Sequence, residues 1–483
     1  MKRVILIGLA ALSIGAKKGD ALPIARPMTA NDRAQGAKAH PQLLEEFGGL
    51  YSGPQAAYVT RVGQKIALQS GLANTQSAFT VSLLNSSVSN AFAIPGGYVY
   101  VTRQLLALMS DEAELASVMG HEVGHVAARH AQQRSNAATK GTLGTILGTV
   151  LGAVVAGSDG AKLGQQLAGS IAQRYVLKYS RSQEYQADDL GVSYLGKAGY
   201  DPMASSTMLA ALAAQTALDA RLQGTEGKAL PEWASTHPDP ASRVTRAAQR
   251  AATTPSTGKL RNRDAFLTAI DGVLYDDDPH QGVVDGQVFR HPDLKLTFTA
   301  PAGFAMTNTP QAVVVSGSGG QAQFTGASFN GDLRGYVDSV FRAVGGQTTL
   351  NYGNIATRQV NGLNAAYASA SANSQSGPVV VTVFAYEFSP TTAFHFVTIS
   401  PVGSAGVFDS LFTSMRRLGA NEIASIRPRR IDIVTVKAGD TVASLAGRMA
   451  YSSYKVERFR VLNALSATGT VRPGQKVKLV VYG

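Results

Sequence analysis

His121, Glu122 and His125 form a short pattern whose residue types and spacing suit hydrolysis assisted by a metal ion. On a helix, His121 and His125 are four residues apart, so both imidazoles project from the same face. Two imidazoles placed in this way supply two ligands of a tetrahedral Zn²⁺. The carboxylate of Glu122 lies one residue on, where it can take a proton from a water that the metal acidifies. The competing interpretation is a surface helix that carries two histidines by chance.

This pattern requires a helix, and the surrounding sequence predicts one amphipathic helix over 111–133. Ser110 is the expected N-cap, and acidic residues follow it in the first turn, where the helix dipole favours negative charge. Apolar residues recur at helical spacing and predict the buried side of the helix: Leu115, Val118, Met119 and Val126. The motif and its helix together are typical of a metalloprotease.

A third ligand is expected in the segment 180–188, within a further helical stretch over 162–197. Glu184 and Asp188 are one turn apart and share a face of that helix. Glu184 can be the third ligand, and Asp188 can accept a hydrogen bond from the far nitrogen of a ligand histidine. The alternative is a solvated acidic face. The chain has no cysteine, so histidines and carboxylates must hold any zinc.

A histidine close after the motif would be another way to complete the ligand set. Zinc proteases of that class place a glycine three residues and a histidine six residues after the second histidine. Ala128 and Ala131 stand at these positions, which excludes the class. His130 is five residues past His125, so we expect it to face elsewhere on the helix and to be structural.

The segment 235–243 holds a further histidine and arginine, His237 and Arg243. Two prolines in this loop restrict its backbone ahead of the next predicted helix. A histidine and an arginine held there could stabilise the oxyanion of a tetrahedral intermediate. A solvent-exposed turn is an equally good interpretation of the same residues.

The strand-like run 91–102 contains a Pro-Gly-Gly break. Proline in a strand belongs at an edge or a bulge, so we expect an edge strand here. An edge strand beside a catalytic helix can accept an extended substrate peptide as an added strand. The residues that would contact such a peptide are Asn90, Ala91, Phe92 and Ala93. An ordinary hairpin is the alternative.

The composition indicates an exported, folded protein. The chain has 483 residues, 45% hydrophobic and 16% charged, which predicts two to four domains with buried cores. Lys2 and Arg3 precede the apolar run 4–16 and predict a signal peptide over 1–21, with a retained N-terminal anchor as the alternative. The uncharged segment 141–157 is shorter than a membrane span requires. We therefore expect a periplasmic protein.

The net charge of +12 does not by itself indicate nucleic acid. Lys and Arg are scattered, and the only cluster is at 427–430. Such a distribution favours a solvated surface, or attraction to an anionic envelope surface or cell-wall polymer. We expect no nucleic-acid partner, and the charge is compatible with peripheral membrane, outer-membrane or cell-wall association.

Together these motifs resemble one family. Residues 49–249 resemble the gluzincin metallopeptidases that include HtpX, the CAAX prenyl protease and the periplasmic BepA-like proteases. The motifs that carry the resemblance are Asn-Ala-Phe-Ala-Ile-Pro-Gly-Gly at 90–97, the histidine motif at 121–125, Ser-Arg-x-x-Glu-x-x-x-Asp at 180–188, and Thr-His-Pro with a following arginine at 236–243. The 34-residue repeats that BepA-like proteins carry at the C-terminus are not found here.

The resemblance implies a mainly α, zincin-like domain with a small β-sheet. It implies one Zn²⁺ per chain on His121, His125 and Glu184, with Glu122 as general base. It also implies that Asp188 and Arg243 support the ligands and that His237 lies near the zinc. In relatives, the loop of His237 can stabilise the transition state or cap the metal in a latent form.

The C-terminal half predicts two further domains. Strand-rich runs with two helical patterns indicate an α+β domain over 263–420, without a metal or nucleophile constellation. Residues 431–483 resemble a LysM module, a small βααβ fold that often binds glycans containing N-acetylglucosamine. The Gly-Asp-Thr turn at 439–441 and the Pro-Gly-Gln turn at 473–475 are its markers. The predicted domains are therefore 22–252, 263–420 and 431–483, after the signal peptide.

These observations favour a zinc-dependent endopeptidase of the bacterial cell envelope that acts on misfolded or unassembled proteins. The alternative is a latent protease that works mainly as a chaperone or peptidoglycan-associated scaffold. The expected partners are polypeptide substrates and, through 431–483, peptidoglycan. A peptidoglycan hydrolase is a weaker interpretation, because the motif set is that of a peptidase family.

Overall fold

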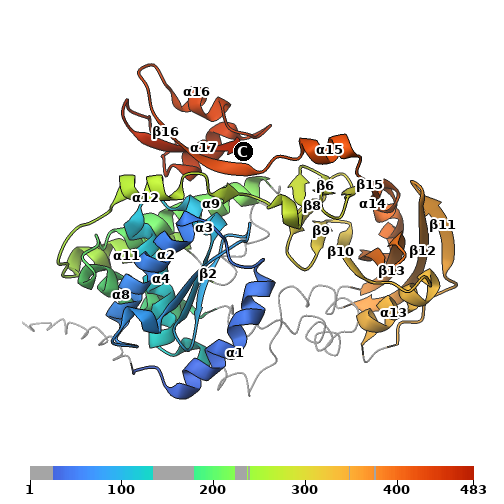
Figure 1. The fold of residues 1–483 in the computed structure, drawn as a ribbon, viewed down its shortest axis with the longest axis horizontal. Coiled ribbons are helices and arrows are strands. Elements are labelled where there is room, and N and C mark those ends of the chain that lie inside the picture. The colour runs from blue at the N-terminus through green and yellow to red at the C-terminus, as the bar shows by residue number, and fades with distance from the viewer. Residues whose placement is uncertain (1–25, 134–178, 223–236, 238–239, 347–348, 375–376) are drawn as a thin grey trace, which may run out of the picture.

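The computed structural model describes residues 26–133, 179–222, 237, 240–346, 349–374 and 377–483 (Figure 1). The predicted signal peptide over 1–21 and the uncharged segment 141–157 lie outside these residues. Within the described part, no helix combines the length and the apolar character that a membrane crossing needs.

The N-terminal half contains a three-stranded sheet between helices. Strand order is β1 (Thr80–Leu84), β3 (Tyr98–Thr102) and β2 (Ala91–Ile94), with β1 parallel and β2 antiparallel to β3. Side chains alternate across the sheet, as the strand period requires. Phe92, Ile94 and Tyr100 pack under α1 (Ala30–Glu46), and the opposite face joins the main core. The run 91–102, predicted as an edge strand, is instead the alternative hairpin: β2 is an edge strand, β3 is the central strand, and the Pro-Gly-Gly break forms the turn between them.

Helices form the other layer of this half: α2 (Pro54–Ala67), α3 (Arg103–Leu108), α4 (Glu112–Ala127), α8 (Arg181–Lys197), α9 (Ala204–Leu222) and α11 (Pro240–Thr253). Short 3₁₀ turns lie at Leu68–Ser70 and Gln76–Ala78. Helices α4 and α8 pack closely because glycines face the contact. A Cβ on Gly120 would lie 3.4 Å from the Gly191 Cα, and a Cβ on Gly124 would lie 3.1 Å from the Ala187 carbonyl oxygen.

Helix α4 is shorter than the sequence predicts. Its N-cap is Asp111, whose carboxylate accepts from the Glu114 N–H, so the expected cap at Ser110 is wrong. The helix ends at Ala127, and Arg129 adopts a left-handed conformation with φ +56°. The single helix predicted over 111–133 is therefore interrupted at residues 128 and 129, and residues 130–133 are helical again beyond the break.

The residues from 283 to 417 form two sheets. The larger sheet has the order β11-β12-β13-β14-β10-β9-β8, and the smaller has the order β15-β7-β6-β5. Helix α13 (Leu333–Gly345) covers one face of the larger sheet, and the opposite face shares a phenylalanine-rich core with the smaller sheet and α14 (Asp409–Ser414). The strands are β5 (Val283–Asp285), β6 (Val288–His291), β7 (Leu296–Thr299), β8 (Ala305–Asn308), β9 (Val313–Gly317), β10 (Gly320–Ser328), β11 (Ala356–Val360), β12 (Leu363–Ser374), β13 (Gly377–Ser389), β14 (Thr392–Pro401) and β15 (Arg416–Arg417).

The C-terminal segment has the order β16 (Arg429–Thr435), α16 (Val442–Gly447), α17 (Lys455–Leu462) and β17 (Lys476–Tyr482). This is the βααβ order that the sequence predicts. Its sheet is extended by β4 (Leu274–Tyr275), which pairs with β16. Figure 1 shows this module seated over α12 (Arg263–Ile270) and α9. Helix α15 (Ala420–Ser425) precedes it.

The module and the N-terminal half share one hydrophobic core. Phe266, Leu267 and Ile270 of α12 join that core together with residues of β16 and β17. The stretch that begins the predicted 263–420 domain therefore packs on the N-terminal half, and the two C-terminal sheets begin only at β5. The predicted domain boundaries themselves stay predictions.

A buried lysine fastens the module to the segment ahead of α4. Lys478 is 1% exposed, and its Nζ donates to the carbonyl oxygens of Ala107, Leu108 and Met109 at 2.8, 3.0 and 2.7 Å. Three carbonyl acceptors match the three N–H groups of an ammonium. Burial lowers the pKa of Lys478 to about 7, opposed by the nearby carboxylate of Glu114. The contact ties β17 to the end of α3.

We expect Lys478→Met to lower the free energy of unfolding by roughly 2–5 kcal/mol, because three buried carbonyls left without a donor cost about 1–3 kcal/mol each, and the removed cost of burying the ammonium offsets part of that loss. Chemical denaturation of the whole chain measures this change. Lys437→Met, at an exposed position of the same module, is the matched control and should change stability by less than about 0.5 kcal/mol. Equal effects of the two substitutions would contradict the anchoring role.

Candidate metal centre

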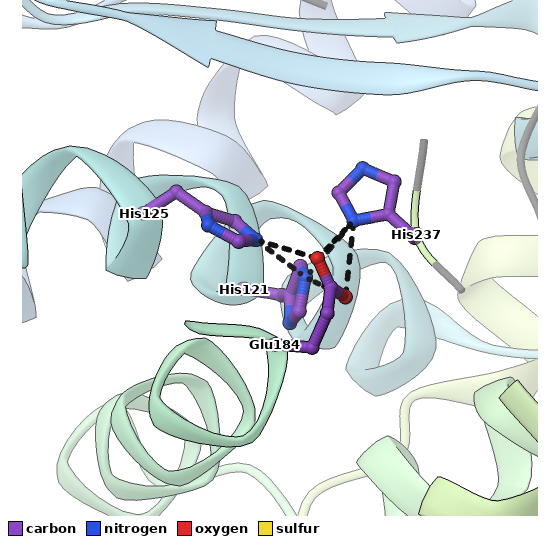
Figure 2. A group of neighbouring side chains, drawn as sticks. All are labelled: His121, His125, Glu184 and His237. Carbon is purple, nitrogen blue, oxygen red and sulfur yellow. Dashed lines mark hydrogen bonds and ion pairs between the residues drawn. The ribbon is translucent and has the colours of Figure 1, made fainter. Parts of the chain in front are cut away.

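Four buried side chains converge on one point (Figure 2). They are His121, His125, Glu184 and His237, and one donor atom of each lies within 4.8 Å of all the others. His121 Nε2 is 3.0 Å from His125 Nε2 and 3.4 Å from His237 Nδ1. His237 Nδ1 is 3.2 Å from both carboxylate oxygens of Glu184. Ligands about 2.0–2.1 Å from a tetrahedral zinc are separated by about 3.3 Å, so these spacings suit a shared cation.

Three separate elements position the four donors. His121 and His125 lie one turn apart on α4, as their spacing requires. Glu184 lies in the first turn of α8, which begins with a capping box between Ser180 and Gln183. The close packing of α4 on α8 brings that first turn opposite the two histidines. His237 lies shortly before α11 in the chain and reaches the group from another side (Figure 2).

The charges around these donors leave room for a divalent cation. Glu122, Glu184 and Asp188 are buried carboxylates, and Arg243 is the buried guanidinium among them. The three carboxylates and the one guanidinium leave two negative charges unbalanced, and a divalent cation would neutralise them. Buried charges require such pairing. A donor set of imidazoles and one carboxylate, without thiolate, suits Zn²⁺.

The pKa values within the group respond to the same charges. Burial raises the pKa of Glu184, but His237 and His121 outweigh burial and leave that pKa below its usual value. Burial lowers the pKa of His125 well below its usual value, which favours the neutral imidazole that a metal needs. Burial also opposes the charged form of His121, yet hydrogen bonds to Asp188 and Glu184 raise its pKa to about 9. The carboxylates that favour a proton there also favour a metal cation.

Asp188 and Arg243 support the donors from behind. His121 Nδ1 lies 2.9 Å from Asp188 Oδ1. The guanidinium of Arg243 donates to both oxygens of Asp188, at 2.8 and 2.6 Å, and also lies 2.5 Å from Glu184 Oε2. The predicted placement of both residues beside the ligands agrees with this geometry. Because Arg243 is 1% exposed and faces these carboxylates, its guanidinium orients them and does not face a substrate.

Glu122 lies beside the donor group but outside it. Its Oε1 is 3.7 Å from His237 Nε2, and this oxygen has no hydrogen-bond partner among the described residues. Burial raises the pKa of Glu122, and the neighbouring His237 and His121 oppose that rise. A buried carboxylate with an unpaired oxygen next to three imidazoles is placed to accept a proton.

The expectation that His130 faces away from the site is wrong. His130 Nδ1 lies 2.8 Å from His125 Nδ1, because α4 ends at Ala127 and the left-handed conformation of Arg129 changes the direction of the chain. The Tyr179 ring, which precedes α8, stacks on His125 with centroids 3.7 Å apart. No sequence pattern pointed to either residue, since both contacts depend on where α4 stops and where α8 begins.

The four residues predicted to bind substrate lie beside the site, but their side chains are largely buried. Asn90 and Ala91 are fully buried, Phe92 packs under α1, and Ala93 is 7% exposed. Neither polar atom of the Asn90 side chain has a hydrogen-bond partner among the described residues. A small cavity of about 30 Å³ lies between Ala93 and His125. A peptide laid along β2 would therefore meet the strand's backbone edge, and this role stays a prediction.

Comparison with known proteins agrees with the site and with the C-terminal module. Residues 54–251 match the profile of Peptidase family M48, and residues 434–480 match that of the LysM domain. The chain is 33% identical over 201 residues to the beta-barrel assembly-enhancing protease of Escherichia coli K12, covering 40% of this chain and 38% of that protein. It is 31% identical over 200 residues to a putative beta-barrel assembly-enhancing protease of Vibrio cholerae, with the same coverage.

A eukaryotic relative matches over a similar length. The mitochondrial metalloendopeptidase OMA1 of Schizosaccharomyces pombe is 28% identical over 209 residues, covering 43% of this chain and 57% of that protein. The chain thus spans about two fifths of the length of the bacterial relatives, and the match to Peptidase family M48 includes His121, His125 and Glu184. A solved structure from Bacteroides thetaiotaomicron has a TM-score of 0.25 and 9% identity over 41% of the chain, too distant to indicate a fold. Residues 54–251 are thus similar to Peptidase family M48, and residues 434–480 are similar to the LysM domain.

Proposed function

We propose that this protein is a zinc-dependent endopeptidase of the bacterial cell envelope that removes misfolded or unassembled envelope proteins. The observation that carries the proposal is the buried group of three histidines and Glu184 with Glu122 beside it. The names of the relatives, which are proteases of β-barrel assembly and of mitochondria, support an endopeptidase acting on proteins.

His121, His125 and Glu184 would hold the zinc. When bound, Zn²⁺ polarises a substrate carbonyl and makes water more acidic. Asp188 accepts the Nδ1–H of His121 and keeps that ring turned towards the donor group. Glu122 takes a proton from the attacking water through its unpaired Oε1 and later delivers it to the leaving amine. Arg243 prevents Asp188 and Glu184 from repelling each other.

His237 closes this site in its resting form. A catalytic zinc site has three protein ligands and a fourth position open to water or substrate. Here the Nδ1 of His237 lies with the other three donors, so it would take that fourth position when zinc is bound. Cleavage then requires His237 to move away, after which its N–H can donate to the oxyanion of the reacting carbonyl. In this proposal the peptidase is held inactive at rest by His237 and becomes active when His237 is displaced.

The rest of the chain would determine where the peptidase works. LysM domains generally bind peptidoglycan-type glycans, and the proposed partner of residues 434–480 is such a glycan. Attachment to the cell wall would hold the peptidase in the periplasm, in agreement with the signal peptide predicted over 1–21. The substrates would be polypeptides, and the two C-terminal sheets would form a docking domain for them or for an envelope partner.

Removing the metal tests the proposal most directly. We expect the purified chain to hold one zinc, and chelation to lower its melting temperature and to abolish any cleavage of an unfolded protein. Zn²⁺ should restore both properties and Mg²⁺ should not, because Mg²⁺ prefers an all-oxygen octahedral site. Elemental analysis, thermal unfolding and a casein digest measure these outcomes. A chain without zinc, or one that cleaves in excess chelator, would contradict the proposal.

A further inference from the structure

The nitrogen of His125 that faces away from the donor group begins a chain of two hydrogen bonds. His125 Nδ1 lies 2.8 Å from His130 Nδ1, and His130 Nε2 lies 2.7 Å from the Gln186 side-chain oxygen. His125 and His130 are both buried, so water does not replace these contacts. Gln186 lies on α8, between Glu184 and Asp188, so the same helix supports both metal-facing histidines.

Only one arrangement of protons in this chain leaves His125 able to bind a metal. The Gln186 oxygen can only accept, so His130 donates through Nε2–H and accepts at Nδ1. His125 must then donate through Nδ1–H, which leaves the lone pair of its Nε2 towards the donor group. If the side-chain amide N–H of Gln186 donated to His130 instead, both hydrogen bonds would run in the opposite direction. The proton of His125 would then be on Nε2, and this nitrogen could not bind a metal.

We propose that His130 and Gln186 are positioning residues that hold His125 in the tautomer and orientation that bind the metal. The inference rests on the proposed role of His125 as a ligand. It differs from the support of His121, which comes from the Asp188 carboxylate. Stacking of Tyr179 on the His125 ring fixes the plane in which the hydrogen bond to His130 is made.

The charge balance explains why two uncharged side chains, those of His130 and Gln186, support His125. Glu122, Glu184, Asp188 and Arg243 together with a divalent cation sum to zero. A carboxylate in place of His130 would add a buried negative charge without a partner, which is costly. An imidazole and an amide give the same hydrogen-bond direction without adding charge.

Two substitutions of similar size separate the hydrogen bond from packing. An asparagine at position 130 has an amide oxygen near the place of the imidazole Nδ1 and can accept from His125, whereas a leucine cannot. We expect His130→Leu to weaken zinc binding by about 10–100-fold, the usual effect of losing such a partner, and His130→Asn to remain within about threefold of wild type. Gln186→Leu should weaken binding several-fold by freeing His130 to take either tautomer.

Competition against a chromophoric zinc chelator measures affinity on the whole chain, and thermal unfolding of the metal-free proteins compares their folds. His280→Leu is the control, because it removes an exposed imidazole far along the chain and should leave affinity unchanged. If His130→Leu does not fold, Gln186→Leu and His130→Asn still decide the outcome. Equal affinities for all variants, or equal losses for His130→Asn and His130→Leu, would overturn the inference. Failure of the wild type itself to bind zinc would instead reject the proposed function.

Discussion

Replacement of Glu122 by glutamine should abolish peptide cleavage while zinc stays bound. Glutamine keeps the shape of the side chain but cannot take a proton from water. Loss of a general base typically slows a reaction by about 10²–10⁴-fold. Because Glu122 lies outside the donor group, the zinc content of the variant should equal that of wild type. Cleavage of an unfolded, fluorescently labelled protein measures the rate, and elemental analysis measures the metal.

The resting rate would be low if His237 closes the site, so the comparison is best made in an opened background. His237→Ala and the double variant with Glu122→Gln form the matched pair. The double variant should be inactive where His237→Ala alone cleaves. Undiminished cleavage by the double variant would exclude Glu122 as the base and point to another carboxylate or to a contaminating protease.

His237→Ala alone should raise the rate of cleavage. In the structure the His237 Nδ1 completes the set of four donors, so its removal opens one position to water and substrate. If the closed form outweighs the open form by tenfold or more, the rate should rise by about that factor. Initial rates at saturating zinc measure the effect, because removal of a donor also weakens the hold on the metal. His280→Ala serves as the control for loss of an exposed histidine.

The direction of this change distinguishes the roles assigned to His237. A rise shows that the closed form limits the wild type, even if His237 also assists the reaction once displaced. A fall, with zinc still bound, would show that His237 is needed for cleavage and that the closed arrangement is not inhibitory. If neither wild type nor variant cleaves any unfolded substrate, the chain is better described as a chaperone or scaffold.

The LysM-like module shares a hydrophobic core with the part of the chain that carries the site. Lys478 donates to three carbonyls at the end of α3, and α4, with its two histidines, begins four residues after Leu108. A module joined only by a flexible linker would leave these carbonyls without a donor. Whatever the module binds therefore acts on a part of the molecule that is continuous with the metal centre.

Much of the candidate site follows from short-range rules. The spacing of His121 and His125 places both on one face of any helix, because 3.6 residues complete a turn. The same rule places Glu184 and Asp188 together on α8, and it holds whatever packs around them. The βααβ order at the C-terminus was also predictable, since its turns are marked locally by Gly-Asp-Thr and Pro-Gly-Gln.

Other features depended on where elements end and on contacts between distant segments. Local helical periodicity continues past Ala127, and only the left-handed turn at Arg129 brings His130 behind His125. The predicted substrate strand is largely buried, because α1 covers the face that Phe92 presents.

The sequence by itself determined the types of the metal-binding side chains and their spacing on two helices, because helix geometry relates residues within one turn. Only the tertiary structure decided that His237 joins them, that His130 and Gln186 lie behind His125, and that Lys478 fastens the LysM-like module beside α4. These contacts join residues that the helix period does not relate. They depend on how whole elements pack in the shared core, which local patterns do not specify.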